Sequence, residues 1–404
     1  MNKPFVLTAE CPAARTDSAF RIMALACLIV FMAQMSTTVY LPSLPVVMQD
    51  LHMTQGAVEL SISAFVFGSA LPLLFWGTVA ERWGRRGPLL VSLALFLVMS
   101  LLLSMCASAF MLLALRFIQG VAGGGCAIVA RIVVRDNWTG DELARRLSVL
   151  SIAFVSALGG GQFIGGVISQ YGHWQTGFLL MAVTAALAIL LTVSVPMRSG
   201  QSHATTQGEK TRYRTIIGRP RFVWPACVGG LGFATTVTLQ QVSPFVFQTH
   251  FHLAVTHFGC IGLLFGLSYF FGAMLVNRFV RQIGAHGLMR IGSGVLALAG
   301  GTIMVLWYAD LLKNHDGMLV FIALYCLAVL GQAILFPNSM ALAVSEVREQ
   351  GAQAMALCGF LQQGLAGLAA TLAVLLQNGG RWTLAVCLLS FMAFLLVRFK
   401  PDTA

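Results

Sequence analysis

One acid and one arginine, Glu59 and Arg116, are the charged side chains that we expect to be embedded in long apolar stretches, and they define the chemistry that this sequence could carry out. Glu59 lies early in the stretch 57–80, and Arg116 lies about six residues, or roughly 9 Å, inside the stretch 110–134. Charge in an apolar environment is costly and usually has a partner or a function. A buried carboxylate such as Glu59 could carry protons. Alternatively, Glu59 is an ordinary glutamate near a helix start, where the helix dipole favours it.

Arg116 has alternatives of its own. It could tune a proton site or bind an anionic substrate. It could equally pair with backbone carbonyls of the first apolar stretch or with Gln34, which would make its role structural.

A short basic loop, from Gly77 to Arg86, could act as a gate. Its glycine permits close helix approach, and its acid could pair with nearby arginines on one face of the membrane. The alternative is a solvated loop that only fixes topology. The gating candidates here and in the next basic loop are Gly77, Glu81, Arg82, Gly84, Arg85, Arg86, Arg131, Arg135 and Asp136.

The elements that must position these residues are membrane helices. The chain has 404 residues, 58% of them hydrophobic and only 10% charged, with a mean hydropathy of +0.83. Such a composition excludes a soluble globular domain. Apolar stretches long enough to cross a core of about 30 Å predict an all-α membrane protein. The twelve expected spans are 22–44, 57–80, 88–108, 110–134, 147–169, 175–197, 222–248, 256–277, 288–308, 318–341, 352–376 and 382–399.

The net charge is +11, and the positive residues are distributed unevenly between the loops on the two sides of the expected spans. All but three of the 25 lysines and arginines (Arg116, Lys313 and Arg381) fall in the N-terminus, the even-numbered loops or the C-terminus. This asymmetry predicts that both termini are cytoplasmic. The positive charge would meet anionic lipid headgroups, and we do not expect nucleic-acid binding.

A polar segment divides the chain into two six-span halves. We expect an N-terminal tail at 1–21, a first bundle at 22–197, a cytoplasmic linker at 198–221, a second bundle at 222–399 and a C-terminal tail at 400–404. Phe67-Gly68 with the loop at 81–86 weakly resembles Phe265-Gly266 with 277–284. Two parallel halves of this kind are typical of secondary transporters.

Cofactors and enzymatic chemistry are not indicated. The nine cysteines are scattered singly, so we expect no metal site and no disulfide framework. GxSxG, HExxH and P-loop motifs are missing, which disfavours a membrane-embedded hydrolase and an ATP-driven pump. A channel remains an alternative, although the two-half organisation favours alternating access.

The motifs together resemble the major facilitator superfamily. Residues 77–86 look like its signature loop, with Glu81 where an aspartate is usual. Residues 116–120 resemble the Arg-x-x-Gln-Gly motif of proton-coupled members. Residues 40–45, 130–136 and 336–338 resemble the Bcr/CflA drug:proton antiporter group, and 32–40 is closest to its EmrD-type branch. The resemblance implies proton-coupled efflux of small amphipathic compounds by a monomer in a bacterial inner membrane.

Two positions depart from that group. Thr38 stands where many members have an aspartate, and Gln162 stands where the span-5 antiporter motif has proline. Proton coupling and direction are therefore open. The alternative is transport of one metabolite, such as a siderophore, peptide or amino-acid derivative, without proton coupling.

Polar and aromatic residues within the spans are candidates for a substrate cavity, although each taken alone could simply pack. They are Gln34, Thr38, Tyr40, Gln119, Phe154, Phe233, Gln240, Gln241, Tyr269, Gln332 and Gln362. Small residues are expected at close helix contacts. These helix-packing candidates are Gly120, Gly124, Gly161, Gly165 and Gly166.

Overall fold

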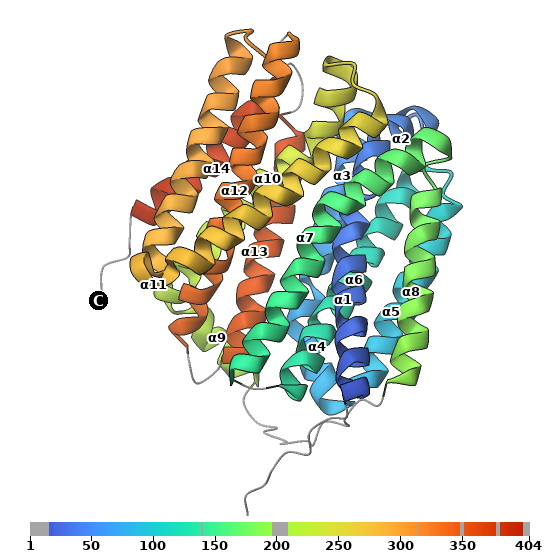
Figure 1. The fold of residues 1–404 in the computed structure, drawn as a ribbon, viewed down its shortest axis with the longest axis vertical. Helices are drawn as coiled ribbons and strands as arrows, with labels where there is room; N and C mark the ends of the chain where they lie inside the picture. The colour runs from blue at the N-terminus through green and yellow to red at the C-terminus, as the bar shows by residue number, and fades with distance from the viewer. Residues whose placement is uncertain are drawn as a thin grey trace, which may run out of the picture.

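The computed structural model describes residues 16–138, 140–195, 209–312, 314–347, 351–376 and 380–398, and this part of the chain is almost entirely helical (Figure 1). The N-terminal half contains α1 (Thr16–Thr38), η1 (Leu41–Ser43), α2 (Leu44–Asp50), α3 (Gln55–Ala70), α4 (Pro72–Arg82), α5 (Arg86–Ser104), α6 (Ala109–Asn137), α7 (Gly140–Tyr171) and α8 (Thr176–Ser194). The C-terminal half contains α9 (Glu209–Ile217), α10 (Pro220–Phe245), η2 (Val246–His250), α11 (Val255–Tyr308), α12 (His315–Ser345), α13 (Gly351–Val374) and α14 (Trp382–Arg398).

Local sequence explains where several helices begin and end. The Thr54 and Ser108 hydroxyls accept the backbone N–H groups of Ala57 and Met111, and so cap α3 and α6. Pro72 lacks an N–H, so the second span breaks there into α3 and α4.

The expected twelve spans are confirmed. In the described residues ten helices are long and apolar enough to cross a membrane, and the 17-residue α14 adds a shorter apolar one. The 54-residue α11 would be about 80 Å long if straight, more than twice a bilayer core. It holds two spans, because the chain reverses at Gly284, whose φ is 73° (Figure 1).

Two expected boundaries differ from the structure. The first span was expected at 22–44, but α1 ends at Thr38 and the chain continues through η1 and α2, where Pro42 and Pro45 interrupt the helix. The loop expected between 277 and 288 is helical except at Gly284. Residues 1–15, 198–208 and 400–404 of the expected tails and linker lie outside the described residues, and α9 occupies part of the linker.

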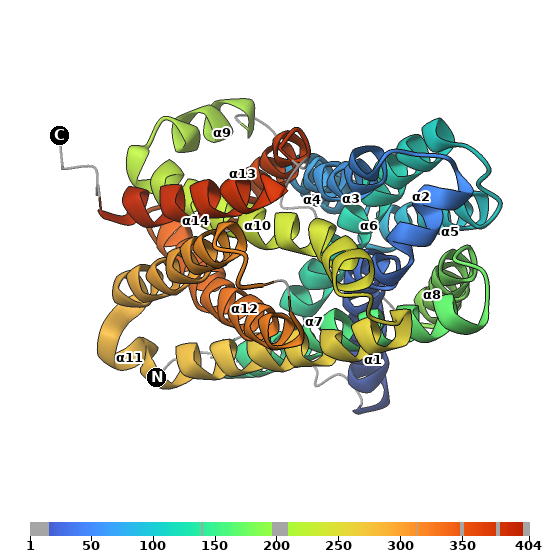
Figure 2. The same ribbon diagram turned by 90° about the horizontal axis from the view of Figure 1, so that it is seen from above.

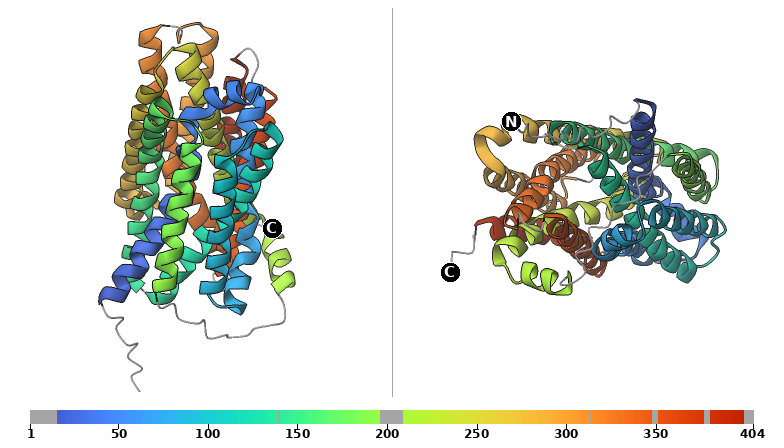
Figure 3. Two further views of the ribbon diagram at one scale, coloured as in Figure 1. Left: turned by 90° about the vertical axis from the view of Figure 1, so that its right-hand side faces the viewer. Right: turned by 90° about the horizontal axis from the view of Figure 1, so that it is seen from below.

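The two halves pack side by side, as the view from above shows (Figure 2). They meet mainly where α7 contacts α11 and where α3 contacts α13. Apolar clusters fill the interior of each half, while large apolar side chains such as Leu190 and Leu372 face outward, as expected in lipid. We call the end with Arg85, Arg86, Arg135 and Asp136 the basic end. The opposite end holds η1, α2 and the starts of α3 and α11 (Figures 1 and 3).

Candidate functional site

Arg116 is fully buried in the middle of the N-terminal half. It lies on α6, and its Nη1 donates to the Ser36 carbonyl of α1 at 3.0 Å and to Gln119 Oε1 at 2.7 Å. Gln119 is oriented in turn, because its Nε2 donates to Ser100 Oγ on α5 at 2.9 Å. One fixed network therefore ties the arginine to α1, α5 and α6.

Aromatic rings surround the rest of the guanidinium. Its central carbon lies 4.6 Å from the Phe65 ring, 5.1 Å from Tyr40 and 5.7 Å from Phe178. The Nε and Nη2 atoms have no hydrogen-bond partner in the described structure. A cavity of about 10 Å³ adjoins this cage, lined in part by Ser36, Tyr40 and Phe178. The ring faces attract the cation, but two donors remain available.

Glu59 is buried near the opposite end of the bundle. Only 1% of the residue is exposed, and its Oε1 accepts a hydrogen bond from Gln55 Nε2 at 2.8 Å. It is the fifth residue of α3, beyond the first turn, where the helix dipole acts most strongly.

Thr38 and the glycines of α7 form a close contact between α1 and α7. The Thr38 hydroxyl donates to the Ala157 carbonyl at 2.9 Å. A Cβ on Gly161 would overlap that hydroxyl, and one on Gly165 would overlap the Val39 carbonyl. Thr38 is therefore placed at a packing contact within one half.

Close contacts of the same kind join α3 to α6. A Cβ on Gly120 or Gly124 would overlap the carbonyl oxygens of Phe65 or Ser69. Gly166 has a different partner, since its backbone packs against Gly259 of α11 in the other half. The small residues thus set both the packing within the N-terminal half and the contact between halves.

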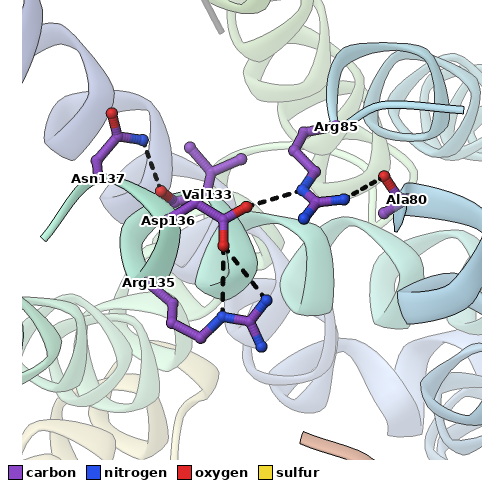
Figure 4. A network of polar contacts seen from close by, with 6 residues as sticks. All are labelled: Ala80, Arg85, Val133, Arg135, Asp136 and Asn137. Carbon is purple, nitrogen blue, oxygen red and sulfur yellow. Dashed lines mark hydrogen bonds and ion pairs between the residues drawn. The ribbon is translucent and has the colours of Figure 1, made fainter. Parts of the chain in front are cut away.

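An ion-pair cluster lies at the basic end (Figure 4). Arg85 Nε contacts Asp136 Oδ2 at 2.8 Å, and Arg85 Nη1 donates to the Ala80 carbonyl at 2.5 Å. Arg135 Nη2 reaches the other oxygen of Asp136 at 3.3 Å. The cluster joins the start of α5 to the end of α6.

The other basic-end candidates have separate positions. Gly84 adopts φ 79°, a left-handed conformation that favours glycine. Arg86 donates to the Val193 carbonyl at the end of α8. Arg131 is exposed on α6. The side chains of Glu81 and Arg82 and the environment of Gly77 lie outside the described part of the structure.

The cavity candidates fall into two groups. Phe154 on α7 and Tyr269 on α11 are half-buried and lie 5.7 Å apart across the two halves. Gln34, Phe233 and Gln240 are also half-buried, and Phe233 packs on Phe336 within one half. The second group is buried: Tyr40, Gln119, Gln241, Gln332 and Gln362.

Sequence reasoning missed several polar contacts between the halves. Gln248 Nε2 donates to the Pro42 carbonyl at 2.9 Å, and Ser69 Oγ donates to Gln363 Oε1 at 3.1 Å. These partners are far apart in the chain, and no local pattern marks them.

Comparison with known proteins supports this architecture. Residues 26–371 match the family model described as Major Facilitator Superfamily. The Bacillus subtilis uncharacterized MFS-type transporter YdgK is 27% identical, covering 83% of each chain. The Haemophilus influenzae bicyclomycin resistance protein homolog is 24% identical, covering 79% of this chain and 80% of the relative. Multidrug resistance protein D of Escherichia coli is 25% identical over 92% of each chain.

Solved structures share the fold. A D-xylose–proton symporter superposes with a TM-score of 0.79 at 15% identity, covering 94% of this chain and 97% of its own. A partially occluded, inward-open xylose transporter from E. coli gives 0.75 at 14% identity, covering 96% and 99%. The expected twelve-helix architecture in two halves is thereby confirmed.

Proposed function

Because this chain belongs to the major facilitator superfamily and is therefore a multi-pass membrane transporter rather than an enzyme, we propose that it exports small amphipathic compounds in exchange for protons. The exchange proceeds by alternating access of the two halves. Relatives named for bicyclomycin and multidrug resistance support this substrate class.

The observation that carries the proposal is the composition of the contact between the halves. Phe154 and Tyr269 face each other there from α7 and α11, and both are half-buried. The polar Ser69–Gln363 contact joins α3 to α13 across the same interface. The interface thus offers both aromatic faces and neutral polar groups, from different helix pairs, and this combination suits molecules that have both apolar and polar surfaces.

Glu59 is the proposed proton carrier. Its carboxyl is buried, and its own backbone carbonyl accepts a hydrogen bond from Gln241 Nε2 of the other half at 3.2 Å. A proton gained or lost there changes the charge directly beside a contact between the halves, and so can bias their relative positions.

We place the protein in the bacterial inner membrane as a monomer, with the basic end and both termini in the cytoplasm. The concentration of arginines at that end supports this orientation.

The test uses purified protein in proteoliposomes loaded with a pH-sensitive dye. Addition of a lipophilic cation such as tetraphenylphosphonium across an imposed pH gradient should move protons and compound in opposite directions. Glu59→Gln should abolish proton movement. The control is Glu142→Gln, at a surface carboxylate whose side chain is 41% exposed, and it should leave proton movement unchanged. If the pH gradient still drives movement of the compound unchanged in Glu59→Gln, Glu59 is not the proton carrier. Compound movement without proton movement in the unmodified protein would refute exchange.

A second candidate, transport of one anionic metabolite, is favoured by Arg116. Its two unpartnered nitrogens are donors suited to a carboxylate. The same vesicles with a panel of carboxylate compounds decide between the two, because only this candidate predicts saturable transport of a single anion.

A further inference from the structure

Three glutamines cross the interface between the halves in the same way. Gln162 Nε2 on α7 donates to the Phe258 carbonyl of α11 at 3.0 Å. Gln241 and Gln248, from the C-terminal half, donate to the carbonyls of Glu59 and Pro42 at 3.2 and 2.9 Å. In each case a neutral side-chain amide meets a backbone carbonyl of the other half.

All three bonds lie toward the opposite end of the bundle. Pro42 belongs to η1, Phe258 lies in the first turn of α11, and Glu59 follows directly after the first turn of α3. Gln241 is fixed further, because its Nε2 also donates to Ser63 Oγ at 2.5 Å. The ion pairs described at the basic end, such as Arg85–Asp136, join residues of one half instead. A further bond between the halves lies away from the opposite end, where the Tyr213 hydroxyl of α9 donates to the Leu74 carbonyl of α4 at 3.2 Å.

The glycine face of α11 makes room for Gln162. A Cβ on Gly262 would meet the Gln162 side chain at 2.6 Å, and one on Gly259 would lie 3.1 Å from its backbone oxygen. The residue is 4% exposed, so its amide is enclosed by both halves. The proline that stands here in the antiporter motif has no donor and could not make this bond.

We propose that Gln162, Gln241 and Gln248 form a clasp that holds the opposite end closed, and that this clasp must open for the transporter to face the other side of the membrane. The proposal rests on alternating access, but not on proton coupling or on the substrate. Its bonds are uncharged, so ionic strength should not weaken the clasp.

Hydrogen bonds between membrane helices typically contribute about 0.6 kcal/mol each, a factor of about three in an equilibrium. Replacing all three glutamines by methionine, which preserves length, removes four bonds between the halves and should therefore favour the state open at this end by roughly 60- to 80-fold. Single replacement of Gln162 or Gln248 should give about a threefold shift, and that of Gln241, which makes two bonds, about a ninefold shift.

The experiment measures the distance between spin labels at Tyr171 and Leu311, exposed residues of the two halves at the opposite end, after the native cysteines are replaced. The triple variant should populate a longer distance than the parent. Gln170→Met, an exposed glutamine on the same α7, is the matched control and should leave the distribution unchanged.

A triple variant that matches the control would overturn the clasp. If the triple variant does not fold, the single variants decide, and unchanged distances in all three would reject the proposal equally. Because this readout needs neither substrate nor a pH gradient, it can fail or succeed independently of the transport assay.

Discussion

Replacement of Arg116 by methionine should abolish transport but leave the protein folded. The substitution removes the hydrogen bonds to Ser36 and Gln119 and the contacts with three rings, worth about 5–10 kcal/mol together. It also removes two buried unpartnered donors and the desolvation cost of a buried cation, about 5–10 kcal/mol in the opposite direction.

These terms nearly cancel, so the free energy of unfolding should change by less than about 3 kcal/mol. Methionine also approaches the length of the arginine stem and avoids a large cavity. In a protein of this size the unfolding temperature should therefore shift by less than about 10 °C.

The assay pairs thermal unfolding in detergent with transport in proteoliposomes. Arg290→Met, at an exposed arginine, is the control and should keep both properties. Failure of Arg116→Met to fold, with a normal control, would show that the guanidinium mainly stabilises the bundle. Normal transport by a folded Arg116→Met would show that the buried cation is dispensable.

Three further substitutions test the packing and the basic end. Gly124→Ala should lower the unfolding temperature strongly, because its methyl would overlap a backbone carbonyl of α3, whereas Gly160→Ala, with open space around it, should be neutral or stabilising in the same melt. Asp136→Asn removes the partner of Arg85. Since both side chains are partly exposed, the free energy of unfolding should fall by only about 1 kcal/mol, and 1 M salt should reduce this difference. A loss of several kcal/mol that does not depend on salt would contradict this. Gly84→Ala should cost about 1–2 kcal/mol through its left-handed backbone alone, measured by chemical denaturation, and no cost would mean that the turn rearranges freely.

Most of the fold could be predicted from the sequence because each span is a continuous apolar run. Errors arose where one residue decides the backbone. Pro42 and Pro45 stop the first helix early, although the residues around them are apolar enough to continue. Gly284 alone reverses α11, so a loop of several residues was expected where helix continues on either side.

The candidate site was less predictable because its contacts join distant residues. The sequence indicated that Arg116 is buried, and one alternative, a backbone carbonyl of the first span, matches the Ser36 bond. The partner ring Phe178 is 62 residues away and gave no signal. Gln162 was identified as a departure from a motif, but its bond to Phe258 depends on how the two halves dock.

The two halves share a backbone feature that their side chains no longer share. Each turns back at the basic end on a left-handed glycine, Gly84 with φ 79° and Gly284 with φ 73°. The first of these turns is followed by Arg85, which belongs to the ion-pair cluster, and Arg86, and the second by Ala285 and His286. Replacing the turn at Gly84 by the turn at Gly284 would keep the path of the backbone and remove the positive charges that follow it. The turn between these helices can therefore be exchanged when chimeric carriers are built.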